Sequence, residues 1–219
     1  MSIQSNIQQI CSTLPKGVRL LCVSKYHTVS QTREAYDVGI RDFGESRAAE
    51  LEQKALALPK DIRWHFIGHL QRNKAKTVCR YASMIQSVDS LPLLLTINSV
   101  ATRQIDVLLE IHIAKETTKT GFSVGQLNLL LQQNNLFSLS NIRIRGLMGM
   151  ATQTDDTALI HSEFKQLKDL FDQLRQTCFA DKPYFDTLSM GMSDDYEIAI
   201  SEGSNMVRIG SRIFDEQNE

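Results

Sequence analysis

The sequence predicts an α/β fold, a single-domain closed (β/α)8 barrel of the TIM type. Three observations lead to this prediction. Eight short apolar runs are typical of buried strands, segments with helical spacing of apolar residues separate them, and no linker rich in proline, glycine or serine interrupts the chain. A doubly wound open sheet is the alternative, but it usually has a glycine-rich turn after its first strand, and residues 25–28 contain no glycine.

The elements follow in chain order. Residues 1–17 form a predicted helix and turn, because Ile3, Ile7 and Ile10 recur at helical spacing and a proline and a glycine close the segment. Residues 18–214 form the barrel, and residues 215–219 form a tail. The eight predicted strands are residues 18–24, 42–44, 63–67, 84–88, 106–113, 142–147, 185–188 and 206–209. The seven helices predicted between them are residues 31–38, 47–57, 73–82, 91–102, 124–134, 157–177 and 196–201.

Residues that favour helix starts support several of these helices. Ser30 and Ser90, and Thr154 with Asp155 and Asp156, precede helical patterns, and such side-chain oxygens can accept hydrogen bonds from the first free amides of a helix. Asp194 and Asp195 precede the short helix at residues 196–201, where acidic side chains suit the helix dipole.

Composition excludes several classes of protein. With 24 basic and 25 acidic side chains the net charge is near zero, which does not favour a nucleic-acid partner. The longest apolar stretch is too short for a membrane span and the N-terminus resembles no secretion signal, so we expect a cytoplasmic protein. The four cysteines have no paired spacing, and His65 and His69 would stand roughly 13 Å apart on a strand, so we expect no disulfides and no metal site.

Lys25 ends the first strand, which is apolar throughout. In a barrel of this type, chemistry is built on the carboxyl ends of the strands. A lysine there is expected to have its stem packed on the sheet and its amine in a cavity, where desolvation makes the amine easier to deprotonate. A neutral lysine is a nucleophile for aldehydes. The other interpretation is a lysine that merely extends into solvent from the strand end.

The loops after the last two predicted strands are suited to an oxyanion. Residues 189–195 contain Gly191 and Ser193, and residues 207–212 contain Gly210 and Ser211. Small residues let the backbone approach a ligand, and hydroxyls donate to phosphate oxygens. Barrels often hold a phosphate at this place, although each loop alone is also compatible with an ordinary turn.

Several short motifs occur in the order found in one protein family. They are Val-Ser-Lys at 23–25, Phe-Gly-Glu at 43–45, Trp-His-Phe-Ile-Gly at 64–68, Lys-Thr-Gly at 119–121, Gly-Leu-Met at 146–148, Leu-Ser-Met-Gly-Met-Ser at 188–193 and Val-Arg-Ile-Gly at 207–210. From about residue 18 to residue 214 the chain resembles the pyridoxal phosphate homeostasis proteins. The combination is specific, although no single motif is.

This resemblance implies a fold-type III barrel like the N-terminal domain of alanine racemases, holding pyridoxal 5′-phosphate (PLP) as a covalent aldimine at Lys25. It implies that Ser193, Gly210 and Ser211 hold the phosphate. It also implies that Arg208 faces the pyridine nitrogen and that Met148 forms a pocket wall beside the ring. The implied role is intracellular PLP homeostasis, in which the protein carries or buffers PLP without a dedicated catalytic reaction. The implied partners are PLP and PLP-dependent apoenzymes, and we expect a monomer.

Three positions depart from the family's pattern. Ser46 stands where asparagine is usual, and the shorter side chain could lose a contact to the cofactor or its neighbours. Ser211 stands where threonine is commoner but keeps the hydroxyl. Asp215 stands where a glycine often follows, which affects only the geometry of the tail.

Arg208 bears on whether a bound cofactor would do chemistry. PLP acts as an electron sink when its ring nitrogen is protonated, and an arginine donates to that nitrogen without protonating it. Alanine racemases have a tyrosine four residues after the lysine, where this chain has Val29. They also take a second base from an additional domain, and we expect no such domain here. Two alternatives stay open. They are a small PLP-dependent racemase-like enzyme with Lys25 as its only base, and a cofactor-free Schiff-base enzyme of the aldolase type that binds a sugar phosphate.

Overall fold

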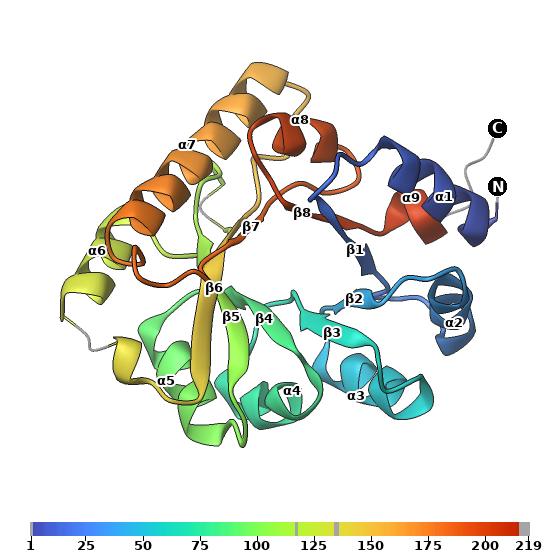
Figure 1. Ribbon diagram of the computed structural model, residues 1–219, viewed down its shortest axis with the longest axis horizontal. Coiled ribbons are helices and arrows are strands. Elements are labelled where there is room, and N and C mark those ends of the chain that lie inside the picture. The colour runs from blue at the N-terminus through green and yellow to red at the C-terminus, as the bar shows by residue number, and fades with distance from the viewer. Residues whose placement is uncertain (1, 117, 134–135, 215–219) are drawn as a thin grey trace.

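The computed structural model describes residues 2–116, 118–133 and 136–214, and within them eight parallel strands close into a barrel. Each strand pairs with the next in the chain, and β8 pairs with β1. Figure 1 shows the strands as a ring surrounded by helices, with the chain running once around it. The predicted fold class is therefore confirmed. The predicted tail at 215–219, with Asp215, and the predicted helix end at residue 134 lie outside the described residues.

The strands and helices follow the predicted alternation. The strands are β1 Arg19–Val23, β2 Asp42–Glu45, β3 Arg63–Phe66, β4 Met84–Val88, β5 Ile105–Ile111, β6 Ile142–Gly149, β7 Thr187–Ser189 and β8 Met206–Ile209. The helices are α1 Ile3–Thr13, α2 Val29–Asp37, α3 Ala48–Ala57, α4 Ala75–Tyr81, α5 Leu91–Val100, α6 Val124–Gln133, α7 Thr157–Gln176, α8 Tyr196–Ser201 and α9 Ser211–Phe214. Two 3-10 turns, η1 Arg72–Lys74 and η2 Leu136–Ser138, complete the list.

The structure differs from the prediction at the start of α2 and in the short helix α9. The prediction that Ser30 precedes the first barrel helix is wrong, because α2 begins at Val29 and Thr28 caps it. Thr28 and Gln31 form a reciprocal capping box, which satisfies two backbone amides at once. Helix α9 corresponds to none of the predicted helices, because a single turn is too short to show helical periodicity in the sequence.

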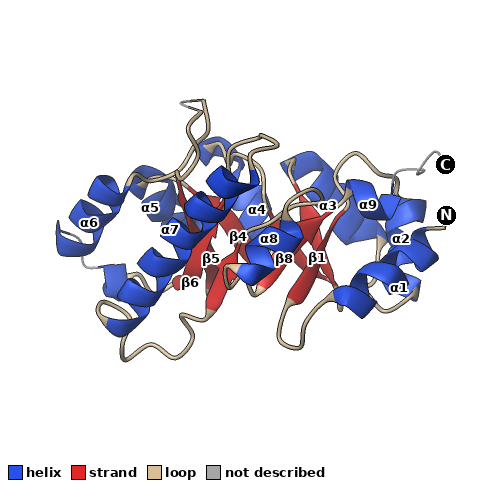
Figure 2. Cartoon of the chain, turned by 90° about the horizontal axis from the view of Figure 1, so that it is seen from above, coloured by secondary structure: helices blue, strands red, loops and turns tan. Residues whose placement is uncertain are grey.

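A continuous apolar core lies between the strands and the helices around them. Figure 2 shows the strands enclosed by helices on both sides of the view. The first and last helices lie side by side, because the Asn6 side-chain amide of α1 donates to the Ile213 carbonyl of α9 at 3.0 Å. Among the described residues, none of the helices combines the length and apolar composition that crossing a membrane requires.

Ion pairs close the amino-terminal end of the barrel. Arg145 of β6 contacts Asp106 of β5 at 3.0 Å and Asp186, just before β7, at 2.8 Å. Arg143 pairs with the same Asp106 at 2.7 Å. Charged side chains at this end stabilise the fold, whereas a site for chemistry is expected at the opposite end.

Candidate functional site

The predicted site residues lie at the carboxyl ends of β1, β6, β7 and β8, or just beyond them. Met148 and Arg208 are in β6 and β8 and are buried, with 2% and 5% of their surfaces exposed. Ser193 follows β7 and is also buried, whereas Ser211 begins α9 and is exposed. Strands β7, β8 and β1 are neighbours in the barrel, so the loops after them share one stretch of the rim.

Lys25 lies in a turn beyond the strand that was expected to carry it. β1 ends at Val23, and the His27 amide donates to the Ser24 carbonyl at 3.1 Å, which turns the chain at Lys25. The expectation of a packed lysine stem is therefore wrong: Lys25 is exposed, and its amine lies 5.7 Å from the centre of the Tyr26 ring. The physical reason is the turn, which carries Lys25 away from the pleated surface of β1.

A close approach joins the loop after β8 to the end of β1. A Cβ atom at Gly210 would lie 3.0 Å from the Val23 carbonyl oxygen and 3.2 Å from the Val23 Cβ. Real side chains seldom tolerate such distances, so glycine permits this contact. As a result, Gly210 and Ser211 lie beside the strand end that leads into Lys25.

The loop after β7 is fixed against both β8 and α8. The Arg208 amide donates to the Gly191 carbonyl at 3.0 Å, which joins this loop to β8. Gly191 has a φ of +96°, and a Cβ there would lie 2.6 Å from the Cβ of Ala199 in α8. The Met192 amide donates to the Asp195 carboxylate at 2.6 Å. Ser193 is therefore held in a rigid loop, next to the loop that carries Gly210.

A chain of hydrogen bonds crosses the barrel interior below Arg208. The Arg208 guanidinium donates to the Ser189 hydroxyl at 2.8 Å, and that hydroxyl donates to the Gln86 side-chain oxygen at 2.7 Å. The Gln86 amide nitrogen lies 2.9 Å from His65 Nδ1, and His65 Nε2 lies 3.3 Å from the Asp42 carboxylate. These side chains come from β8, β7, β4, β3 and β2, so the chain runs from one end of the barrel toward the other.

The two ends of this chain determine the direction of every bond in it. A guanidinium can only donate, and an ionised carboxylate can only accept. Ser189 must therefore donate to Gln86, which leaves the Gln86 amide to donate to His65 Nδ1. His65 then carries its proton on Nε2 and donates it to Asp42. Burial opposes ionisation of Asp42, but hydrogen bonds from His65 and Arg63 outweigh it and hold the pKa of Asp42 well below its usual range.

Arg208 stays a cation in this environment. Burial lowers the pKa of Arg208 to about 10, against the attraction of Asp195 and Glu110. The side chain is therefore protonated at neutral pH. It also donates to the Gly149 carbonyl at 3.0 Å, beside Met148. Met148 packs against Met84 and Leu108 inside the barrel.

A buried ion pair behind the Lys25 turn was missed by the sequence analysis. Lys54 of α3 lies 2.6 Å from the Glu45 carboxylate of β2, and both side chains are almost fully buried. Gln86 was missed as well, because a polar residue inside the mostly apolar run at 84–88 does not reveal its partners. Lys54 did leave a signal, since it lies three residues after Leu51 and one before Ala55, on the apolar face of its helix.

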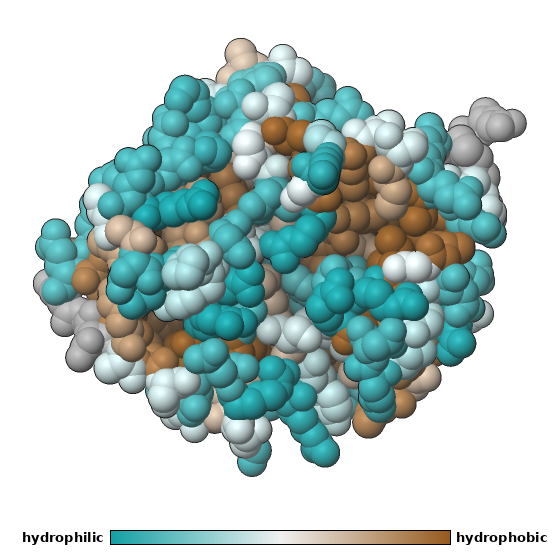
Figure 3. Space-filling view, in the orientation of Figure 1, coloured by the Kyte–Doolittle hydropathy of each residue, from teal (hydrophilic) through white to brown (hydrophobic). Residues whose placement is uncertain are grey.

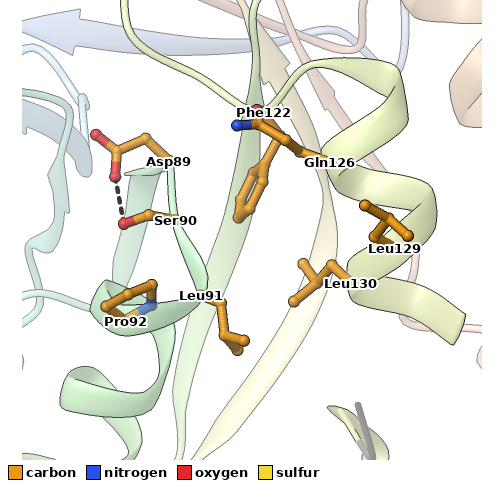
Figure 4. Close-up of a pocket in the computed structure, with 8 residues that line it drawn as sticks. All are labelled: Asp89, Ser90, Leu91, Pro92, Phe122, Gln126, Leu129 and Leu130. Atoms are coloured by element: carbon orange, nitrogen blue, oxygen red, sulfur yellow. Dashed lines mark hydrogen bonds between the residues drawn. The ribbon is translucent and has the colours of Figure 1, made fainter. Parts of the chain in front are cut away.

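Two pockets differ in where they lie relative to the predicted site. A pocket of about 630 Å³ borders it, because Met192 and Asp194, the neighbours of Ser193, line its wall. Another, of about 290 Å³, lies between α5 and α6, where Figure 3 shows apolar atoms at the surface. In Figure 4, Phe122 extends into this second pocket and the Ser90 hydroxyl donates to Asp89 at its edge. Its lining includes none of the predicted site residues.

Two lesser predictions concern charged groups on the barrel rim. The predicted ion pair between Glu116 and Lys119 is confirmed, at 3.0 Å. The Glu116 carboxylate accepts hydrogen bonds from the Gln153 amide, from the Glu116 amide and from the Lys119 amine, and these bonds lower the pKa of Glu116 to about 2. In the part of the chain that the structure describes, no cluster of histidine, cysteine, aspartate and glutamate side chains is placed to hold a metal ion.

Sequence comparison finds relatives over nearly the whole chain. The family described as "Alanine racemase, N-terminal domain" matches residues 1–217. A protein of Synechocystis sp. named pyridoxal phosphate homeostasis protein is 37% identical over 214 residues, 94% of this chain and 94% of its own. The Escherichia coli K12 protein of the same name is 34% identical over 211 residues, 93% of this chain and 88% of its own. The predicted resemblance is confirmed.

Solved structures give the same result for the fold. PipY of Synechococcus elongatus without PLP is 33% identical, with a TM-score of 0.90 over 97% of this chain and 100% of its own. PipY with PLP bound matches with a TM-score of 0.86 over the same shares. An alanine racemase of Clostridium difficile 630 is 15% identical, with a TM-score of 0.79 over all of this chain and 60% of its own. That enzyme shares the barrel fold.

Proposed function

This chain belongs to the family of the pyridoxal phosphate homeostasis proteins, and from that premise we propose that it binds PLP and acts as a carrier or buffer of it. The observation that carries the proposal is the approach of Gly210 to Val23, which brings a hydroxyl-bearing loop beside the turn of Lys25. The relatives are named as homeostasis proteins rather than as enzymes, which agrees with a binding role.

The residues present fit the phosphate of PLP. Ser193 and Ser211 supply hydroxyl donors from two neighbouring loops, and Gly210 keeps the backbone free of a side chain where the loop meets β1. Small residues and hydroxyls in adjacent loops suit an oxyanion that needs several donors at once. We assign the phosphate to Ser193, Gly210 and Ser211.

The fit of the ring depends on Arg208 and Met148. Arg208 is a buried cation with donors on both terminal nitrogens, so it can donate to a pyridine nitrogen and cannot protonate it readily. Bound PLP supplies an electron sink, which works best with a protonated ring nitrogen. Arg208 therefore favours holding the cofactor over using it. Met148 lies in the strand next to Ser189, the partner of Arg208, and we assign it to the pocket wall beside the ring.

We assign the covalent link to Lys25. Its amine, once neutral, adds to the aldehyde carbon, and the resulting carbinolamine loses one water to leave a Schiff base. The exposed turn gives the amine access from solvent, which suits a protein that must load and release its ligand. We further propose that PLP-dependent apoenzymes receive the cofactor and that the protein acts in the cytoplasm. We also propose that the protein is a monomer, and light scattering on the protein during size-exclusion chromatography tests this.

An absorbance titration tests the binding role. Purified protein mixed with PLP should develop a Schiff-base band that is absent from Lys25→Ala, while Lys115→Ala, which removes another exposed lysine, should keep it. A wild-type protein that stays colourless after PLP is added would rule out the proposal. Steady exchange of the α-hydrogen of single-enantiomer amino acids in deuterated water would instead favour a racemase-like enzyme.

A further inference from the structure

The turn that carries Lys25 has a backbone conformation that does not form without support. Tyr26 has a φ of +69°, in the left-handed region that bulky residues rarely adopt. Among the described residues, the others with a positive φ are all glycines. A tyrosine in this region is strained and persists only where its surroundings impose it. The contacts around Lys25 must therefore hold the turn.

Helix α3 provides these contacts on both sides of Lys25. The Lys54 amine donates to the Ser24 carbonyl at 2.6 Å, in the peptide group that precedes Lys25. The Tyr26 amide, in the peptide group that follows Lys25, donates to the Glu50 carboxylate at 3.1 Å. Residues 50 and 54 are four apart and face the same side of the helix. One helix face thus holds both peptide groups of Lys25.

Glu45 in turn holds Lys54. Its Oε1 accepts from the Lys54 amine at 2.6 Å and from the Ser24 hydroxyl, also at 2.6 Å. Glu45 has no exposed surface and Lys54 has 3%. The second carboxylate oxygen, Oε2, is buried without a hydrogen-bond partner among the described residues.

Stability alone does not account for this arrangement. Desolvation offsets most of the attraction in a buried ion pair, and well-packed apolar residues of similar volume are often as stable. An unsatisfied buried carboxylate oxygen adds to the cost. What the pair does accomplish is to fix the Ser24 carbonyl, one bond from the nitrogen of Lys25.

We propose that Glu45, Glu50 and Lys54, here called the α3 clamp, are positioning residues that orient Lys25 for its reaction with the aldehyde of PLP. The proposal rests on the proposed function, because it assumes that Lys25 is the residue that reacts. Lys54 and Glu50 touch the backbone of the turn, Glu45 of β2 holds Lys54, and the three act on the amine through that backbone. Its loss should leave the protein folded but let the turn relax, so that the amine meets the aldehyde less often.

The main test replaces both buried charges together. Glu45→Leu with Lys54→Met leaves no charge without a partner, so the variant should fold, and its midpoint of chemical unfolding should lie only modestly below that of the wild type because the buried Ser24 hydroxyl loses its acceptor. PLP titration should show an apparent affinity about tenfold weaker, as expected when a reacting group loses its alignment. The induced circular dichroism in the absorbance band of bound PLP, which reports a fixed orientation of the cofactor, should weaken as well. A purely structural pair would leave both optical readouts unchanged in the folded variant.

Two further variants make the test decisive. Glu50→Ala removes the half-buried acceptor of the Tyr26 amide, so it keeps the test valid if the double variant does not fold. The control is Lys165→Met with Asp169→Leu, which removes an exposed ion pair on α7 and should bind PLP like the wild type.

The outcomes separate this inference from the proposed function. If the wild type itself fails to bind PLP, the proposed function is wrong and the clamp has no ligand to serve. If the wild type binds and the folded clamp variants match it in affinity and dichroism, the positioning role is overturned while the binding role stands. Weaker binding in the clamp variants and unchanged binding in the α7 control would support both.

Discussion

Replacing Gln86 by leucine should destabilise the protein markedly, because this side chain joins two halves of a buried hydrogen-bond chain. Gln86 has no exposed surface, accepts from Ser189 at 2.7 Å and faces His65 Nδ1 at 2.9 Å. Leucine fits the volume but leaves the hydroxyl and the imidazole nitrogen without these partners. Each of these two unsatisfied buried groups costs about 1–3 kcal/mol, so the expected loss in the free energy of unfolding is about 2–6 kcal/mol.

Thermal and chemical unfolding measure this effect. For a domain of this size about 1 kcal/mol moves the Tm by about 2–4 °C, so we expect Gln86→Leu to melt roughly 4–24 °C below the wild type. The exposed Gln166 of α7 gives a matched control, and Gln166→Leu should shift the free energy of unfolding by less than about 0.5 kcal/mol. A Gln86→Leu variant that loses no more than the control would refute the assigned chain of hydrogen bonds.

Other substitutions test separate parts of the fold. The pKa of Asp42 is depressed in the folded protein, against burial, by His65 and Arg63, so its contribution is present above the unfolded-state pKa of about 3.9 and is lost as pH falls below it. Unfolding of Asp42→Asn and wild type should therefore differ most near about pH 6 and less near about pH 3, and a constant gap would contradict this assignment. Gly146→Ala should lower the free energy of unfolding by about 3 kcal/mol or more, because a Cβ there would lie 1.8 Å from a β7 carbonyl oxygen. The control Gly125→Ala in α6 should be neutral or stabilising, and equal melting temperatures for the two variants would argue against the contact at Gly146.

The fold was predictable because it depends on patterns that repeat along the chain. Each strand is a short apolar run and each helix has a periodic apolar face, so a barrel of eight units shows its topology in sequence order. Helix ends were less predictable, because Thr28 and Ser30 are both good caps and only the backbone decides which one is used. The one-turn helix α9 has too few residues to show a period.

The site was predictable only in part. Lys25, Ser193 and Gly210 could be named as candidates because they follow strands in a barrel, the end at which chemistry is expected. The exposed turn of Lys25 was not foreseen, because it depends on contacts from Lys54 and Glu50, which are distant in sequence. Side chains that hold other side chains carry no local pattern, so they emerge only when the strands are placed around the barrel.

Locating the bound aldehyde tests most directly whether Lys25 holds the cofactor. Wild-type protein loaded with PLP, reduced with borohydride and digested should yield one phosphopyridoxyl group per chain, on the peptide that contains Lys25. The same treatment of Lys25→Ala should leave that peptide and the rest of the chain unlabelled above background. Labelling spread over many surface lysines, or equal labelling of Lys25→Ala, would contradict the claim that Lys25 holds the cofactor.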